Sequence, residues 1–334
     1  MTQIAILGGG SWGTALAILL AQNPKGHGVS LWVHDPALAE ALRRDRVNAV
    51  YLPGWAIPPG VRVTPDTGEA LAGARIVLGV MPSAHARGVY TQALPHLTPE
   101  MVFVSATKGL EPHTHARMSE LLAQVVSPKF APRIAVLSGP SFAAEAVRGD
   151  PTAVVLASRD AKLAATLQEE LSGPAFRLYT NDDVRGVEYA GAMKNVIAIA
   201  AGACQGLGLG SNSLAALITR GLAEMTRLAV ALGALPETLS GLAGLGDLVL
   251  TCTGALSRNR RVGVELGQGR ALGEILAGMR MVAEGVHTTD ALRELARAPG
   301  VELPITEQVY AILHGQRSPR EAIRAIMERP LKRE

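Results

Sequence analysis

This chain of 334 residues has few cysteines, few aromatic residues and little net charge. Its two cysteines, Cys204 and Cys252, have neither the spacing of a metal site nor the number needed for a disulfide framework, so we expect reduced core thiols and no bound metal. The net charge is only +3, and no run of Lys and Arg is interleaved with aromatic residues. These absences argue against a nucleic-acid partner.

Long apolar runs are absent as well. No stretch reaches the roughly 18 uninterrupted apolar residues that mark a membrane-spanning helix. Residues 2–7 read as a strand that leads directly into glycines, which is unlike a signal peptide. We therefore expect a cytoplasmic protein without a membrane span.

Glycine is abundant, with 36 residues, and the length favours two domains. Through residue 182, short apolar runs alternate with helical patterns, which predicts a parallel sheet covered on both faces. The expected strands are 2–7, 29–33, 76–80, 102–105, 134–138, 152–157 and 176–179. The expected helices are 12–22, 36–45, 85–94, 115–125, 143–147 and 161–171.

Strand signals vanish after about residue 181, and helices rich in Ala, Gly and Leu follow. They are expected at 183–204, 213–232, 258–266, 288–297, 306–314 and 319–327. An Asn or Asp near 181–184 is suited to cap the first of them. The sequence thus predicts an α/β fold with an N-terminal Rossmann-type domain, 1–182, that binds a dinucleotide. A C-terminal all-helical domain, 183–334, would bind substrate and carry catalysis.

Residues 8–13, Gly-Gly-Gly-Ser-Trp-Gly, fit the pattern G-x-G-x-x-G between the first strand and the first helix. Gly8 would allow the tight turn, Gly10 would let the backbone approach a pyrophosphate, and Gly13 would permit close helix–strand packing. The helix N-terminus would face the anion. The alternative is a generic glycine turn, but its place at the first βα turn of an α/β pattern favours dinucleotide binding.

The end of the second expected strand bears on the choice between NAD and NADP. Asp35 is suited to bind the ribose hydroxyls, which favours NAD. His34 could instead bind the 2′-phosphate of NADP together with the downstream Arg43, Arg44 and Arg46. The alternative is that these three arginines form a solvated helix face. The choice stays open from the sequence.

Lys194 lies in the middle of a long apolar helical pattern. A lysine is almost never fully buried without a partner, because removing water from an ammonium costs several kcal/mol. Hydride transfer to a ketone produces an alkoxide, which calls for a proton donor and nearby positive charge. Lys194 is the candidate donor. Lys108, just past the carboxyl end of an expected strand, is the candidate second cation, although a surface lysine is the simpler interpretation of Lys108 alone.

Two further segments suggest anion chemistry. Asp247 is the only acid in the apolar stretch 240–250, so we expect it to pair with Lys194 or to bind a substrate hydroxyl, with helix capping as the alternative. Residues 257–261, Ser-Arg-Asn-Arg-Arg, place three arginines in a helix's first turn, against the helix dipole. A bound phosphate would resolve that conflict, and salt-bridged surface arginines are the alternative. The turn 138–143 would border cofactor and substrate, or is simply a capped turn.

Taken together, these segments resemble those of bacterial-type NAD(P)-dependent glycerol-3-phosphate dehydrogenases over essentially the whole chain. The segments that carry the resemblance are 8–13, 106–110, 138–143, 191–198, 217–224, 244–253, 257–261 and 282–285. The resemblance implies reversible hydride transfer between NAD(P)H and dihydroxyacetone phosphate, giving sn-glycerol 3-phosphate for phospholipid synthesis. It also implies a homodimer formed through the helical domain.

The resemblance assigns roles to individual residues. Lys194 would exchange the proton, Lys108 would lie beside substrate and nicotinamide, and Asp247 would orient Lys194. Further substrate contacts would come from Gly139, Ser141, Ser257, Arg258 and Asn259. Cofactor contacts would come from Ser11, Trp12, His34, Ala143, Arg258, Val282 and Glu284. One departure is Gln205, where the family commonly carries an acid, so local electrostatics would differ there.

Two rival interpretations deserve a test. A dehydrogenase of the same build that acts on a β-hydroxy acid or on ketopantoate would also use a helical lysine, but its substrate carries a carboxylate. A regulatory protein that binds NAD(H) without catalysis would not need both Lys194 and Asp247. The arginine turn and Lys108 favour a phosphate substrate.

Overall fold

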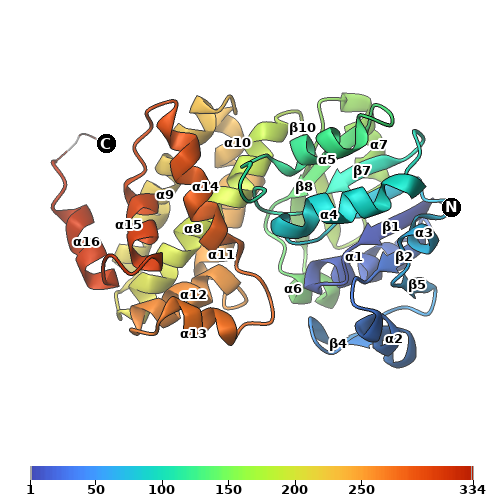
Figure 1. The fold of residues 1–334 in the computed structure, drawn as a ribbon, viewed down its shortest axis with the longest axis horizontal. Coiled ribbons are helices and arrows are strands. Elements are labelled where there is room, and N and C mark those ends of the chain that lie inside the picture. The colour runs from blue at the N-terminus through green and yellow to red at the C-terminus, as the bar shows by residue number, and fades with distance from the viewer. Residues whose placement is uncertain (1, 332, 334) are drawn as a thin grey trace. The chain divides into compact units, whose positions relative to one another are not determined.

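The structure is a computed structural model, and it describes residues 2–331 and 333. The chain divides into two compact units, Met1–Glu188 and Tyr189–Glu334, which Figure 1 shows with their elements labelled. The functional boundary expected between residues 182 and 183 stays a prediction.

The N-terminal unit contains an eight-stranded sheet in the order β10-β9-β8-β7-β6-β1-β2-β5. Its strands are β1 (Gln3–Leu7), β2 (Gly28–Trp32), β5 (Val61–Thr64), β6 (Ile76–Gly79), β7 (Val102–Ser105), β8 (Arg133–Ser138), β9 (Thr152–Ala157) and β10 (Phe176–Asn181). A separate hairpin joins β3 (Val47–Asn48) and β4 (Leu52–Ala56). The sequence patterns predicted neither this hairpin nor β5.

The predicted parallel sheet is confirmed, with one exception, because β8 and β9 run antiparallel. The connection between them explains the reversal. Its helix, α6 (Ala143–Arg148), rises only about 9 Å at 1.5 Å per residue. The six residues of β8 span about 20 Å. The chain therefore stays at the edge where β8 ends, and β9 runs back from there.

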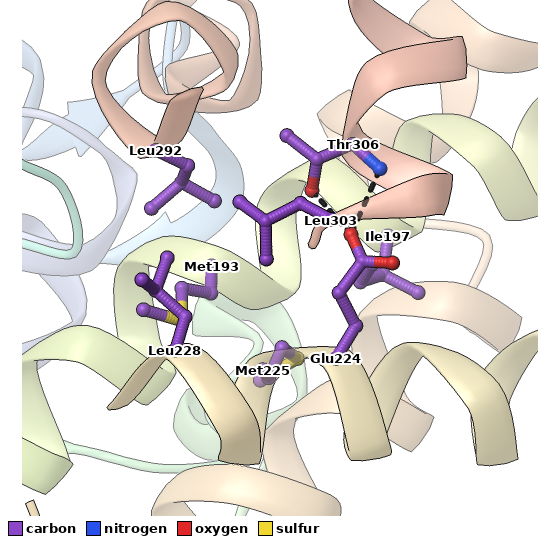
Figure 2. Close-up of a pocket in the computed structure, with 8 residues that line it drawn as sticks. All are labelled: Met193, Ile197, Glu224, Met225, Leu228, Leu292, Leu303 and Thr306. Atoms are coloured by element: carbon purple, nitrogen blue, oxygen red, sulfur yellow. Dashed lines mark hydrogen bonds between the residues drawn. The ribbon is translucent and has the colours of Figure 1, made fainter. Parts of the chain in front are cut away.

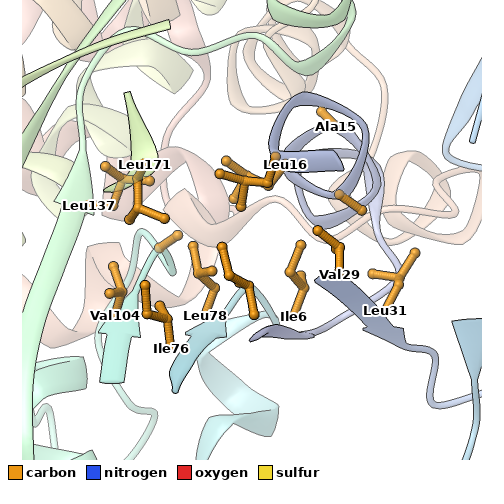
Figure 3. Packing of buried hydrophobic residues seen from close by; sticks show 14 of the residues in the cluster. Ile6, Ala15, Leu16, Val29, Leu31, Ile76, Leu78, Val104, Leu137 and Leu171 are labelled. Carbon is orange, nitrogen blue, oxygen red and sulfur yellow. The ribbon is translucent and has the colours of Figure 1, made fainter. Parts of the chain in front are cut away.

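Helices cover both faces of the sheet, as predicted. Within β1, Ile4 and Ile6 pack on one face and Ala5 and Leu7 on the other, as the period of a strand requires. Figure 3 shows the first face, where Leu16 of α1 packs against strand residues. The helices that cover this first face are α1 (Ser11–Ala21), α2 (Pro36–Asp45) and α7 (Ala161–Leu171). The other face carries α3 (Thr67–Leu71), α4 (Ser83–Ala93) with the short helix η1 (Leu94–His96), and α5 (Met118–Val126).

Helix α5 begins later than the sequence pattern predicts. Residue 115 was the expected start, but His113 and His115 have φ angles of 71° and 58°. These left-handed conformations are incompatible with a continuing right-handed helix. The helix therefore starts at Met118, with Arg117 as its N-cap.

The C-terminal unit is helical throughout its described residues. Helix α8, Val184–Gly206, begins in the last residues of the N-terminal unit and continues as the first helix of the C-terminal unit. Asp183 Oδ1 accepts a hydrogen bond from the Gly186 N–H at 2.8 Å, which confirms the predicted cap. The others are α9 (Ser211–Ala231), α10 (Pro236–Ser240), the π-helix η2 (Leu242–Gly246), α11 (Asp247–Thr253), α12 (Arg258–Gly267), α13 (Leu272–Ala277), α14 (Glu284–Arg297), α15 (Pro304–Leu313) and α16 (Pro319–Met327). Within the described part of the chain, no helix is long and apolar enough to cross a membrane.

Helices α8 and α12 approach each other closely through glycines. A Cβ added at Gly263 of α12 would lie 2.8 Å from Ala203 N and closer still to Ile199 O, both backbone atoms of α8. One added at Gly202 of α8 would collide in the same way with Arg260 O of α12. The two backbones are thus in direct contact, and this contact fixes the position of the helix that carries Lys194 against the helix that begins at Arg258.

Glu224 of α9 is a buried acid with a structural role. Its carboxylate accepts hydrogen bonds from Ile305 N at 2.8 Å, Thr306 N at 2.9 Å and Thr306 Oγ1 at 2.7 Å, and so it caps α15 (Figure 2). Burial raises the pKa of this carboxyl group, while the bonds from Ile305 and Thr306 oppose the rise. The cavity beside it measures about 10 Å³, so it has room for a water molecule at most and none for a substrate.

Candidate active site

The glycine turn of the N-terminal unit has the geometry that its sequence predicts. Gly8 has φ +133°, and a Cβ there would lie 2.8 Å from the carbonyl carbon of Val80. A Cβ at Gly13 would collide with the backbone of Gly8, so the first turn of α1 packs directly on the loop. Both positions therefore exclude larger residues.

The same turn leaves space for a ligand. A Cβ at Gly10 would meet no atom within 4 Å. Gly10 is also the N-cap of α1, and no side chain caps this helix or places an acid in its first turn. An exposed backbone beside an uncapped helix N-terminus fits a pyrophosphate. Trp12 lies in this first turn, and its ring packs edge-on against Phe176 at 6.1 Å.

Two exposed residues follow β2. The His34 ring lies 5.7 Å from that of Trp32. Asp35 is the N-cap of α2, and its Oδ1 accepts a hydrogen bond from Ala37 N at 2.9 Å. Asp35 therefore has a structural role in addition to the predicted one at the ribose.

The three arginines at the C-terminal end of α2 already have partners within the protein. Arg43 Nε donates to Val63 O at 2.7 Å, and Arg44 pairs with its exposed neighbour Asp45 at 2.8 Å. Arg46 donates to three backbone carbonyls, those of Ile57, Pro58 and Val61. These contacts favour the structural interpretation of the three arginines over a 2′-phosphate site.

Lys108 joins the second predicted turn. Its Nζ donates to Gly139 O at 2.6 Å and to Ser141 Oγ at 3.0 Å. Gly139 has φ +131° and lies tightly against Val154. The structure therefore brings together three predicted site residues of this unit, with Ala143 two residues further on at the start of α6.

In the C-terminal unit, Lys194 and Asp247 form a buried ion pair. Lys194 Nζ lies 2.8 Å from Asp247 Oδ1, and the two residues are 5% and 1% exposed. The predicted pairing is confirmed. Lys194 also donates to Thr251 Oγ1 at 2.7 Å, and that hydroxyl donates to Asp247 O at 2.6 Å. Asp247 is the first residue of α11, directly after the π-helix η2.

Asn259 ties three helices together. Its Nδ2 donates to Asn195 Oδ1 of α8 at 2.9 Å, and its Oδ1 accepts from Gly285 N of α14 at 2.9 Å. A Cβ at Gly285 would lie 2.7 Å from Asn195 O, so this packing requires a glycine. A substrate contact through Asn259 would use its second amide hydrogen. Asn259 therefore positions the segment with Val282 and Glu284, whatever else it binds.

The three arginines of the segment 257–261 have different contacts. Ser257 is the N-cap of α12 and accepts from Arg260 N at 3.2 Å, as its residue type predicts. Arg261 pairs with Glu265 at 2.8 Å, so the salt-bridge alternative holds for this residue. Arg258 is exposed, and within the described residues no carboxylate lies within 4.0 Å of it. Arg258 is thus the one best placed to bind an external anion.

Several neighbours of the lysine were not predicted. Thr251 and Asn195 are polar residues in apolar helices, which marks them as candidates, but spacing alone did not connect them to Lys194 or Asn259. Cys252 is buried beside the ion pair, and burial raises the pKa of its thiol to about 12. Burial also raises the pKa of the Cys204 thiol.

Gln205 is exposed, and no metal-binding group of His, Cys, Asp or Glu occurs among residues 2–331 and 333.

A turn that fits a dinucleotide and a buried lysine held by a carboxylate are what a nicotinamide-dependent dehydrogenase requires, and the fold and site assign the chain to that class. A family model described as the NAD-dependent glycerol-3-phosphate dehydrogenase N-terminus matches residues 3–164, and its C-terminus counterpart matches residues 183–324. The chain therefore belongs to the NAD-dependent glycerol-3-phosphate dehydrogenase family.

Individual relatives agree with this assignment. A protein from Koribacter versatilis named glycerol-3-phosphate dehydrogenase [NAD(P)+] is 59% identical over 99% of this chain and 98% of its own length. One of the same name from Nitratidesulfovibrio vulgaris is 56% identical over 99% of this chain and all of its own. The crystal structure of the Coxiella burnetii glycerol-3-phosphate dehydrogenase superposes with a TM-score of 0.93 at 42% identity, covering 98% of this chain and 99% of the other.

Proposed function

We propose that this protein is an NAD(P)-dependent sn-glycerol-3-phosphate dehydrogenase that interconverts dihydroxyacetone phosphate and sn-glycerol 3-phosphate for phospholipid synthesis. The observation that carries the proposal is the buried Lys194–Asp247 pair in a chain that matches the family over both units. The relatives at 59% and 56% identity carry this name rather than that of a ketopantoate or β-hydroxy-acid dehydrogenase. The rival with a carboxylate substrate is therefore not favoured.

The residues of the N-terminal unit fit NAD or NADP. The open Gly10 and the uncapped start of α1 would hold the pyrophosphate, while Ser11, Trp12, His34 and Ala143 would complete the cofactor contacts. When bound, the nicotinamide supplies the hydride. In the C-terminal unit, Val282, Glu284 and Arg258 are the proposed contacts.

Lys194 is the proposed proton donor to the substrate oxygen. Its Nζ carries three hydrogens in the ammonium form, and Asp247 and Thr251 accept two of them at 2.8 and 2.7 Å. These two contacts hold the ammonium group of Lys194 in a fixed position. Asp247 also favours the protonated form, because an opposite charge at this distance stabilises the ammonium. Lys108 is the proposed second cation near the developing negative charge.

The first test is NADH and NADPH oxidation by the purified protein, followed at 340 nm with and without dihydroxyacetone phosphate. Oxidation that requires this substrate is expected, and the ratio of the two rates decides the cofactor preference. The arginine contacts of Arg43, Arg44 and Arg46 favour a faster rate with NADH. Absence of oxidation by folded protein that still binds NAD(P)H would contradict the proposal.

Replacing Arg258 by alanine is expected to raise KM for dihydroxyacetone phosphate by about 10- to 100-fold, because a charge-assisted bond to a phosphate contributes about 1.5–3 kcal/mol. We expect a smaller change in kcat. The matched control is Arg261→Ala, three residues on in the same helix, which removes an exposed arginine whose partner, Glu265, keeps its ion pair with Arg270. Equal KM values for Arg258→Ala and Arg261→Ala would disprove the phosphate contact.

Three further proposals follow from family membership. We propose residues 1–182 as the cofactor domain and residues 183–334 as the substrate and catalytic domain, a division that agrees with a C-terminal family match beginning at residue 183. We also propose a cytoplasmic homodimer. Size-exclusion chromatography with light scattering would measure twice the chain mass of 34.9 kDa.

A further inference from the structure

The N-terminal unit contains a cavity of about 610 Å³ that the proposed reaction does not use. Four arginines line it: Arg117, Arg133, Arg159 and Arg185. Its volume lies in the range of small-molecule sites, which runs from about 300 to 1,000 Å³. Four guanidinium groups around one concave site suggest an anionic ligand.

The cavity lies away from the glycine turn. Arg133 is the first residue of β8, and Ser158, another lining residue, follows the end of the antiparallel β9. Both therefore lie at the edge where the parallel strands begin. The turn Gly8–Gly13 follows β1 at the opposite edge of the same sheet. The two sites of this unit are thus separate.

Three of the four arginines have no carboxylate partner within the described part of the chain. Arg133, Arg159 and Arg185 are exposed, and none lies within 4.0 Å of an Asp or Glu oxygen in residues 2–331 or 333. The acids in the lining, Glu120 and Asp160, already have partners. Glu120 pairs with Arg117, and Asp160 caps α7 through Lys162 N and Leu163 N, each at 3.0 Å.

Arg117 forms a rigid part of the cavity wall. It is 3% exposed, and its Nη1 lies 2.6 Å from Glu188 Oε2. Glu188 is buried as well, and it also accepts bonds from Ser119 N and Oγ at 2.7 and 2.6 Å. This network holds the start of α5 in place beside the three exposed arginines. Arg117 and Glu188 therefore hold one wall of the cavity in a fixed position.

Three helices begin beside the cavity, and carboxylates of Glu188, Asp160 and Asp183 already accept bonds from their first backbone N–H groups. Residues that begin three helices line the cavity: Ser119 in α5, Asp160 before α7, and Arg185 in α8. The N-terminus of each helix carries a partial positive charge from the helix dipole. The capping carboxylates offset this charge in part. The three exposed guanidinium groups add positive charge that these caps do not offset.

We propose that this cavity is a second ligand site of the protein, which binds a small polyanion carrying two phosphate or carboxylate groups. One guanidinium group can bind a phosphate through two hydrogen bonds. Three exposed arginines can therefore bind more than one phosphate or carboxylate group. The concave shape favours a small molecule over the flat acidic surface of a partner protein. This site lies outside the proposed reaction and does not depend on it.

The test is isothermal titration calorimetry with inorganic pyrophosphate at about 0.1 M salt, with saturating NAD present so that the glycine turn, which would itself bind a pyrophosphate, is occupied. Wild-type protein is expected to bind, and the variant Arg159→Gln/Arg185→Gln is expected to show a Kd at least about 100-fold higher, since each of the two charge-assisted bonds contributes about 1.5–3 kcal/mol. Arg133→Gln alone is expected to raise Kd by about tenfold. Both variants change exposed side chains, so their melting temperatures should match that of the wild type.

Two controls assign the binding to the cavity. Arg62→Gln/Arg75→Gln removes two exposed arginines of the same unit that do not line the cavity, and it should bind pyrophosphate as the wild type does. Arg258→Ala should also retain this binding, which separates the cavity from the proposed substrate site. Absence of binding to the wild type at millimolar pyrophosphate would overturn the proposal. So would equal Kd values for the wild type and Arg159→Gln/Arg185→Gln, or an equal loss in the Arg62→Gln/Arg75→Gln control.

Discussion

Replacing Lys194 by methionine is expected to lower kcat by at least about 10²- to 10⁴-fold, the usual contribution of a positioned acid, while Kd for NADH changes little. Methionine retains most of the side-chain length but has no proton to donate. The same substitution leaves Asp247 as a buried charge without its lysine, which costs about 3–5 kcal/mol of stability. The single variant should therefore lose both activity and stability.

The double variant Lys194→Met/Asp247→Asn separates these two losses. It removes both charges of the pair, so the free energy of unfolding should recover toward the wild-type value. The kcat should not recover, because the proton donor is still absent. Stopped-flow single turnovers and urea unfolding of the three proteins measure the two quantities. A double variant whose kcat rises with its stability would show that Lys194 has only a structural role.

Replacing Gly263 by alanine is expected to destabilise the protein by about 3 kcal/mol, the upper end of ordinary overpacking. The added methyl would lie inside contact distance of Ile199 O and Ala203 N, which are backbone atoms of α8 and cannot rotate away. Helices α8 and α12 would have to separate. Because α8 carries Lys194 and α12 begins at Arg258, we also expect a loss of kcat/KM in the protein that remains folded.

Gly273→Ala is the matched control for this substitution. Gly273 lies on the exposed surface of α13, and a Cβ there would meet no atom within 4 Å. Alanine at this position should stabilise the protein by about 0.5–1 kcal/mol, because glycine loses more backbone entropy than alanine when a helix folds. The two substitutions should thus shift the urea midpoint in opposite directions. Destabilisation of similar size in both would mean that the α8–α12 contact does not explain the effect at Gly263.

The apolar periodicity predicts which segments form strands and helices, but it carries little information about strand direction. An interior strand covered on both faces is a continuous apolar run whether its neighbour is parallel or antiparallel. The direction of β9 depends on how far the connection through α6 can reach. That distance is not encoded in the apolar pattern of the strands. The strand β5 was missed for another reason. Its four residues, Val61–Thr64, are too few to establish a period against the turns around them.

For the site, the sequence predicts the charged residues better than the neutral ones. Lys194 and Asp247 stand out because a charge in an apolar segment is costly, and the structure pairs them at 2.8 Å. Thr251 carries no such cost, because a helical threonine can bond to its own backbone, as Thr251 does with Asp247 O. The contacts of Asn259 with Asn195 and Gly285 depend on three helices meeting, which no local pattern encodes.

The two native thiols, Cys252 buried and Cys204 half-buried, make this chain a convenient host for site-specific labels. The thiolate is the form that reacts with maleimides and disulfide reagents, and the raised pKa values of Cys204 and Cys252 keep both side chains protonated at neutral pH. A cysteine introduced at an exposed position would therefore react far ahead of the native pair. A fluorophore placed at Ala161, an exposed residue next to the lining residue Asp160, would report on ligand binding in the arginine-lined cavity, with the four arginines and the native cysteines left in place.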